Sequence, residues 1–331
     1  MPRSEIIGHE NIIRFLAQVR TRGTVSHAYL FAGPSSVGKT AVAARFIGEL
    51  LGISQPAERL SDPFVGLRAY PDLNIIERED DPKSGKRRKN ISIEQIRALR
   101  ERLGKSSLLS SWKIGLIVEA ETLSDEAANA LLKTLEEPAG KTVLILLSSS
   151  PGILPATVKS RCEFVRFNLV SERSIRDGLI RRGVRADEAA ELAGRASGRP
   201  GAAVRELQNP EAAQGNQEKA LQFVQIFGAP VWRRLRFAEA AAPEKGAIAS
   251  ADAAAATLGV WEAVLHDALV IAAGEPALAH LATFRDRIRT WAEARGPAAV
   301  LAALSSLTLA RAALAENVPP RLAFEQVLLK I

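Results

Sequence analysis

Apolar residues in the first half of the chain form short runs separated by segments with helical spacing. The segments between the runs place apolar residues three or four positions apart, as Ile12, Leu16 and Val19 do near the N-terminus. Strands that alternate with helices predict a parallel sheet covered by helices on both faces. The runs that fit buried strands are residues 27–32, 73–76, 114–118 and 143–147.

Several helix boundaries can be read from capping signals. Ser92 followed by Gln95 is typical of a capping box, so a helix is expected to begin there. Ser124 precedes Asp125 and Glu126, which suit the positive end of a helix. A further helix is expected over residues 40–51, directly after a glycine-rich loop.

The strand pattern ends near Leu169. Residues 170–208 predict two or three short helices, and the alanine-rich remainder from about 215 predicts longer ones. We therefore expect an α/β domain over residues 1–168, a small helical domain over 169–210 and an all-α C-terminal domain over 211–331.

Composition narrows the class of protein. A net charge of +7 favours contact with nucleic acid or an acidic partner, although a merely solvated basic surface explains it equally well. The single cysteine, Cys162, excludes an intramolecular disulfide and a cysteine-based zinc cluster. The N-terminal residues lack the pattern of a signal peptide, and the uncharged run at residues 296–310 is too short to span a bilayer. A cytoplasmic protein without membrane contact is expected.

The glycine-rich loop has the pattern of a phosphate-binding loop between a strand and a helix. Its glycines let backbone N–H groups turn toward phosphate oxygens, its lysine reaches the β- and γ-phosphates, and its threonine hydroxyl suits magnesium. The alternative is a relic loop that keeps this shape and binds nothing. The loop consists of Gly33, Pro34, Ser35, Ser36, Val37, Gly38, Lys39 and Thr40.

The acidic residues that ATP hydrolysis uses are incomplete after the strand at 114–118. Glu119 takes the position that helps to hold magnesium, and Ala120 stands where a carboxylate usually polarises the attacking water. If the strand continues, Glu121 projects with Glu119 and away from the water. Hydrolysis by this chain is therefore predicted to be weak or absent.

Two charged segments have both a functional and a structural interpretation. Arg161 follows the last predicted strand, at the edge of the α/β domain, where it could stabilise charge on the γ-phosphate of a neighbouring subunit. A surface arginine in a structural ion pair explains it as well. The basic loop at 83–89 could contact DNA phosphates or an acidic surface, or simply be hydrated.

Taken together, these segments resemble the clamp-loader branch of the AAA+ ATPases, and within it the delta-prime subunits of bacterial DNA polymerase III. The most specific run is AANALLKTLEEP at 127–138, which is followed by SRC at 160–162. The other matching stretches are residues 6–10, 27–34, 70–73, 154–155 and 317–325.

The resemblance implies an AAA+ fold whose small helical domain acts as a lid and whose C-terminal domain forms an oligomerisation collar. It implies tau/gamma and delta subunits as partners, a sliding clamp and primed DNA reached through the assembly, and Arg161 as an arginine finger acting in trans. Static, magnesium-dependent ATP binding is expected, without zinc, because the cysteines of the family's zinc module are missing.

The resemblance also suggests two further positions. Ser149 falls where the family places a polar sensor of the γ-phosphate, and a serine at the end of a buried strand is an equally good interpretation. The sensor arginine of the small domain aligns with Gly201, with Arg199 displaced from it. Two other functions stay open: an active tau/gamma-type ATPase that uses Glu119 or Glu121, and a nucleotide-binding enzyme unrelated to replication.

Overall fold

The computed structural model describes residues 6–53, 63–81, 87–109, 112–243, 250–276, 279, 284–316 and 318–331. Residues 83–86 of the predicted basic loop lie outside this part of the chain. The chain divides into two compact units, residues 1–205 and 206–331.

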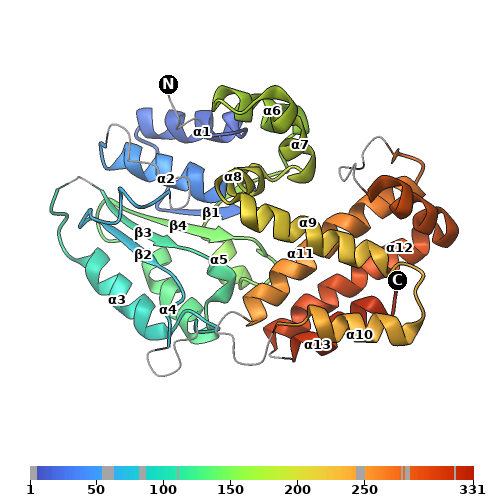
Figure 1. Ribbon diagram of the computed structural model, residues 1–331. Helices are drawn as coiled ribbons and strands as arrows, with labels where there is room; N and C mark the ends of the chain where they lie inside the picture. The colour runs from blue at the N-terminus through green and yellow to red at the C-terminus, as the bar shows by residue number, and fades with distance from the viewer. Residues whose placement is uncertain are drawn as a thin grey trace. The chain divides into compact units, whose positions relative to one another are not determined.

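A five-stranded parallel sheet forms the centre of the first unit (Figure 1). Its strand order is β2-β3-β4-β1-β5, so the strand that leads into the glycine-rich loop lies between two others. The short edge strand β5 is the one strand that the apolar pattern did not predict. The strands are β1 (Ala28–Ala32), β2 (Leu73–Ile76), β3 (Lys113–Ile117), β4 (Thr142–Ser148) and β5 (Glu163–Arg166).

Alternate residues of the strands build a core on each face of the sheet. Tyr29 and Phe31 of β1 pack with Phe46 of α2, whereas Leu30 points to the other face and packs with Leu131 of α4. Figure 1 shows α1 and α2 on one side of the sheet and α3 and α4 on the other. The predicted α/β fold is confirmed. The helices are α1 (Glu10–Thr21), α2 (Lys39–Leu50), α3 (Ile93–Gly104), α4 (Asp125–Glu136) and α5 (Ala156–Lys159), with a 3-10 turn at Ala120–Thr122.

The capping signals act as expected. Ser92 accepts a hydrogen bond from the Gln95 backbone, and the Gln95 side chain accepts one from the Ser92 N–H, which completes the capping box of α3. The Ser124 hydroxyl accepts from the backbone N–H of Ala127 and caps α4.

Three short helices complete the first unit: α6 (Glu172–Arg181), α7 (Ala186–Arg195) and α8 (Pro200–Gln208). They pack directly on the α/β part, because Gly178 of α6 lies against the side chain of Ile7, where a Cβ would meet it at 2.7 Å. The boundaries predicted at 169 and 210 stay predictions.

The regular elements in the described part of the second unit are all helices, as predicted. Trp261 and Phe223 stack at its centre with ring centroids 4.7 Å apart, and Trp291 is buried close by. The helices are α9 (Pro210–Gln225), α10 (Val231–Ala241), α11 (Ser250–Ala272), α12 (Arg285–Ala315) and α13 (Pro320–Leu328).

Two stretches of this unit, Ala253–Ala272 and Arg285–Leu314, have the length and apolar composition of membrane-spanning helices. Core helices of water-soluble proteins pass the same test. Here Trp261 and Leu265 of α11 are fully buried against other helices of the unit. The absence of membrane contact stays a prediction.

Candidate functional site

The phosphate-binding loop joins β1 to α2 at the carboxyl edge of the sheet. Gly38 is the N-cap of α2 in a left-handed conformation, and no side chain caps this helix, so its first backbone N–H groups face the loop. Gly33 is required by close packing, since a Cβ there would lie 2.3 Å from the carbonyl oxygen of Phe167.

Lys39 is buried, and its ammonium lies inside the curve of the loop. Its Nζ donates to the carbonyl oxygens of Gly33, at 2.6 Å, and Pro34, at 2.8 Å. Burial lowers the pKa of Lys39 to about 8, and the negative charge of Glu121 acts in the opposite direction. The ammonium is therefore directed at the position that suits a phosphate and has little water around it.

Ser149 and Glu121 complete the surroundings of this lysine. Lys39 Nζ donates to the Ser149 hydroxyl at 3.2 Å, and the Ser149 backbone N–H donates to Glu121 Oε1 at 3.0 Å. The structure thus brings Ser149 next to the loop lysine, as the sensor prediction requires. Glu121 Oε2 is buried and has no hydrogen-bond partner among the described residues.

The condition for the predicted direction of Glu121 is not met. The prediction assumed that the strand continues past Val118, but β3 ends at Ile117 and Glu119 adopts a left-handed conformation with φ 55°. The chain therefore turns into a 3-10 helix, and the two glutamates no longer point to the same face as they would in a strand. Glu121, rather than Glu119, lies beside Lys39.

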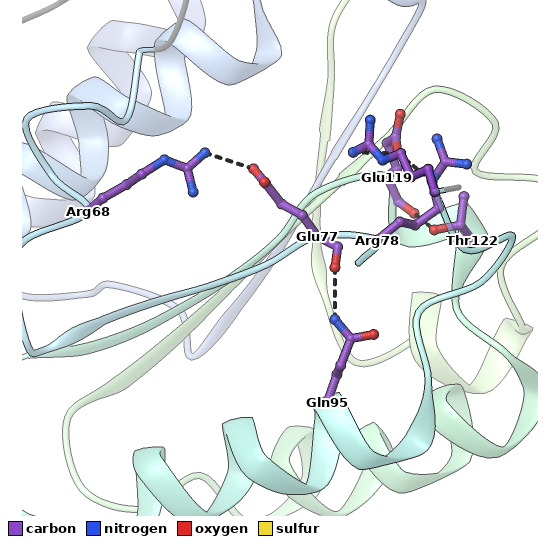
Figure 2. Close-up of polar contacts among 7 residues, drawn as sticks. Arg68, Glu77, Arg78, Gln95, Glu119 and Thr122 are labelled. Carbon is purple, nitrogen blue, oxygen red and sulfur yellow. Dashed lines mark hydrogen bonds and ion pairs between the residues drawn. The ribbon is translucent and has the colours of Figure 1, made fainter. Parts of the chain in front are cut away.

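Glu119 is bound to arginines, as Figure 2 shows for Arg78. Its Oε2 accepts from Arg78 Nε at 2.8 Å and lies 3.7 Å from Arg87 Nη2. The role of Glu119 in holding magnesium stays a prediction, and it would require this carboxylate to exchange partners.

The neighbouring residue, Glu77, connects β2 to α3 (Figure 2). Its carboxylate accepts from Arg68 at 3.1 Å, and its carbonyl oxygen accepts from the Gln95 side chain at 2.8 Å. These bonds fix the chain just before Arg78, and so they position the arginine that holds Glu119.

An arginine that the sequence did not single out reaches the loop from α8. The Arg205 guanidinium donates to the Ser36 hydroxyl, and the Gly201 N–H donates to the Ser36 carbonyl oxygen at 2.8 Å. Gly201 and Arg205 lie four residues apart on one face of α8. Burial lowers the pKa of Arg205, because the charged guanidinium loses water contact there. The i+4 spacing from Gly201 was the signal that could have found it.

His9 supports the loop from the N-terminal segment. Its Nε2 lies 2.8 Å from the Val37 carbonyl oxygen, and its ring packs edge-on against Phe167 with centroids 4.8 Å apart. Burial lowers the pKa of His9, so the neutral ring is favoured at this position. In the sequence, residues 6–10 stand out only as a stretch that matches the clamp-loader family, and no role for His9 is indicated.

Arg161 lies apart from these contacts, between α5 and β5. Its guanidinium donates to the Thr157 carbonyl oxygen at 3.0 Å and forms an ion pair with Glu136 at 2.8 Å. The side chain is 37% exposed. None of these partners belongs to the chain's own phosphate-binding loop.

The loop residues fit a nucleotide phosphate. The uncapped start of α2, the buried Lys39 ammonium and the Ser149 hydroxyl converge at one place, and Arg205 adds a second cation. In the described part of the chain, no group of three His, Cys, Asp or Glu side chains could hold a metal ion by itself. Magnesium would therefore depend on phosphate oxygens together with the Thr40 hydroxyl.

Comparison with known proteins agrees with this geometry. Residues 8–171 match the protein family described as DNA polymerase III, delta subunit. This part of the chain belongs to that family. The predicted resemblance to DNA polymerase III subunits is confirmed for these residues.

Curated relatives match over the same half of the chain. A DNA polymerase III subunit delta' from Pseudomonas aeruginosa is 36% identical over 152 residues, which are 44% of each chain. A Bacillus subtilis delta' subunit is 31% identical over 52% of this chain and 51% of its own. A Bacillus subtilis tau subunit is 30% identical over 52% of this chain and 30% of its own. The matches thus span about half or less of these relatives.

Solved structures are similar to the chain only at low identity and low TM-score. A DNA polymerase III gamma subunit-related protein from Thermotoga maritima has a TM-score of 0.44 at 16% identity, covering 92% of this chain and 99% of its own. A RuvB Holliday junction branch migration motor from Thermotoga maritima has a TM-score of 0.42 at 18% identity, covering 61% of each chain.

Proposed function

We propose that the protein is a delta-prime-like accessory subunit of a DNA polymerase III clamp loader. It assembles with tau/gamma and delta subunits in the cytoplasm, and the complex places a sliding clamp on primed DNA. The family of residues 8–171 supports this proposal, together with the positive net charge.

The observation that carries the proposal is the separation of Arg161 from the chain's own loop. The described partners of Arg161 are Thr157, Ser160 and Glu136, while Lys39 is bound by Gly33, Pro34 and Ser149. A half-exposed guanidinium outside its own nucleotide site suits a contact across a subunit interface. We therefore assign Arg161 the role of arginine finger for a neighbouring ATPase subunit.

The chain's own nucleotide serves a structural purpose in this proposal. ATP would contribute a triphosphate held by the loop amides, Lys39 and Ser149, with Thr40 toward magnesium. The Glu119 carboxylate is occupied by Arg78 and Arg87, and Ala120 carries no acid, so no group on this strand is placed as a general base.

A second candidate, an active tau/gamma-type ATPase, is favoured by Glu121. Its carboxylate lies next to Lys39 and retains one buried oxygen without a partner among the described residues. An acid in this position could orient a water molecule. Steady-state ATP turnover by the isolated chain separates the two candidates, since turnover comparable to that of the assembly would favour the second.

The experiment that tests the proposal is reconstitution with tau/gamma and delta. Arg161→Ala should leave coelution of the subunits intact and lower the ATPase of the clamp-loading assembly by about tenfold or more. Arg185→Ala, which removes a more exposed arginine that is also ion-paired, is the matched control. Unchanged turnover in Arg161→Ala would remove the finger, and failure of the wild-type chain to coelute would remove the clamp-loader assignment.

A further inference from the structure

Glu136 is the one acidic side chain in the described structure that forms an ion pair with Arg161. It is the last residue of α4, and Arg161 follows α5 directly. We propose that Glu136 is a positioning residue, which holds the Arg161 guanidinium in the direction that it needs across the subunit interface. The proposal rests on the proposed function of Arg161.

Both anchors of Arg161 stand on well-packed structure. Val158 of α5 and Leu135 of α4 are buried in the same core, and Cys162 packs against that core directly after Arg161. The backbone on either side of the guanidinium is therefore fixed by the fold. The conformational freedom that remains at this position is therefore that of the Arg161 side chain.

Thr157 and Glu136 contact different nitrogens of the Arg161 guanidinium. Nη1 donates to the Thr157 carbonyl oxygen at 3.0 Å, and Nη2 lies 2.8 Å from Glu136 Oε1. Two bonds from different elements select one orientation of a side chain that otherwise has many rotamers. No described residue accepts a hydrogen bond from Arg161 Nε, so that donor is still available for another molecule.

The ion pair between Arg161 and Glu136 is too exposed to prevent Arg161 from binding a phosphate. The Arg161 side chain is 37% exposed and that of Glu136 is 48% exposed, and ion pairs of this kind contribute little stability. Such a contact cannot hold an arginine back from the stronger charge of a phosphate. It can still direct the side chain, because orientation requires one good acceptor rather than a strong attraction.

Substitution of Glu136 by glutamine or alanine distinguishes the orientation of the Arg161 side chain from the effect of the negative charge at position 136. Glu136→Gln keeps an acceptor oxygen of the same length, whereas Glu136→Ala removes it. In the reconstituted assembly, Glu136→Ala should lower kcat about three- to tenfold without changing KM for ATP, and Glu136→Gln should stay close to the wild type. Glu137→Ala, at the next exposed glutamate, is the matched control.

Three outcomes in this assay would overturn the inference. The first is unchanged or higher turnover in Glu136→Ala. The second is an equal loss in both variants, which would mean that charge rather than position matters. The third is an additional loss when Glu136→Ala is placed in the Arg161→Ala background, since a residue that acts through Arg161 has no further effect there.

A nucleotide-free measurement separates this inference from the proposed function. In the isolated chain labelled with 15N at arginine Nε, the Arg161 signal, assigned by its loss in Arg161→Lys, should be ordered in the wild type and Glu136→Gln and averaged in Glu136→Ala. An averaged wild-type signal would overturn the positioning role. An ordered signal together with normal turnover in Arg161→Ala would instead remove the finger and leave the orientation intact.

Discussion

The carbonyl oxygen of Ser36, in the phosphate-binding loop, accepts a hydrogen bond from the backbone N–H of Gly201 on α8, at 2.8 Å. These residues are far apart in the sequence. The bond ties the loop to the helical segment that follows the sheet, and Arg205 reinforces it through the Ser36 hydroxyl. A change in either element must therefore affect the other.

Replacement of Gly201 tests this connection directly. A Cβ at position 201 would lie 2.8 Å from the Ser36 carbonyl oxygen, which cannot move without moving the loop. We expect Gly201→Ala to lower the free energy of unfolding by about 1–3 kcal/mol, as overpacking usually does. Gly215→Ala is the control in chemical denaturation, because nothing lies within 4 Å of a Cβ there. Equal stability of the two variants would refute the close contact.

Removal of the arginine on α8 should weaken nucleotide binding. Arg205 provides a cation next to Ser36, so Arg205→Ala is expected to lower the affinity for ATP about ten- to hundredfold, the size of one lost charge-assisted hydrogen bond. The measurement is titration with a fluorescent ATP analogue. Arg199→Ala serves as the control, and a larger loss there would mean that Arg199, rather than Arg205, supplies the cation.

Nucleotide affinity should fall as the pH rises through the pKa of Lys39. Burial lowers this pKa to about 8, so the ammonium is roughly 90% charged at pH 7 and roughly 10% charged at pH 9. Because phosphate binds the charged form, affinity should drop about ninefold between these values. In Lys39→Arg the guanidinium stays protonated, so the same titration should lose most of its slope. A wild-type affinity that does not change with pH would contradict the assignment.

Lys39 itself should matter little for turnover by the assembly. In the proposed function this site holds nucleotide without consuming it, so Lys39→Ala should abolish binding by the isolated chain and leave the ATPase of the complex close to that of the wild type. Wild-type tau/gamma and delta are the constant components of the assay. A large loss of turnover would show that this site takes part in the reaction cycle.

More of the fold than of the candidate site could be predicted from the sequence. Apolar runs and caps such as Ser92 and Ser124 identified four strands and several helices, because those signals are local. The short strand β5 was missed, since its four residues leave Phe164 exposed and bury Val165, which gives no apolar run. Edge strands of this kind owe their place to pairing with β1 rather than to their own sequence.

Prediction of the site residues from the sequence failed where the backbone departs from regular geometry or where a contact joins distant parts of the chain. If the strand continued, Glu121 would project with Glu119 and away from the attacking water, but the left-handed conformation of Glu119 turns the chain, and Glu121 lies toward Lys39. Arg205 was missed because its contact with Ser36 spans 169 positions in sequence, and the one local signal, its spacing of four residues from Gly201, does not by itself indicate a contact with the loop. Lys39 and Ser149 could be named from the sequence because a contiguous motif and a family resemblance pointed to them, and the structure brings the two side chains within 3.2 Å.

The close approach of Gly33 to Phe167 has a consequence for chimeric proteins. The carbonyl oxygen of residue 167 occupies the space that a Cβ at residue 33 would need, and the Phe167 N–H also donates to Ala32 at 2.7 Å. A loop transplanted from a homologue must therefore fit against Phe167, which lies more than a hundred residues downstream. A graft that keeps glycine at position 33 should fit, whereas one that places a larger residue there would push the outermost strand, β5, away from its neighbour β1.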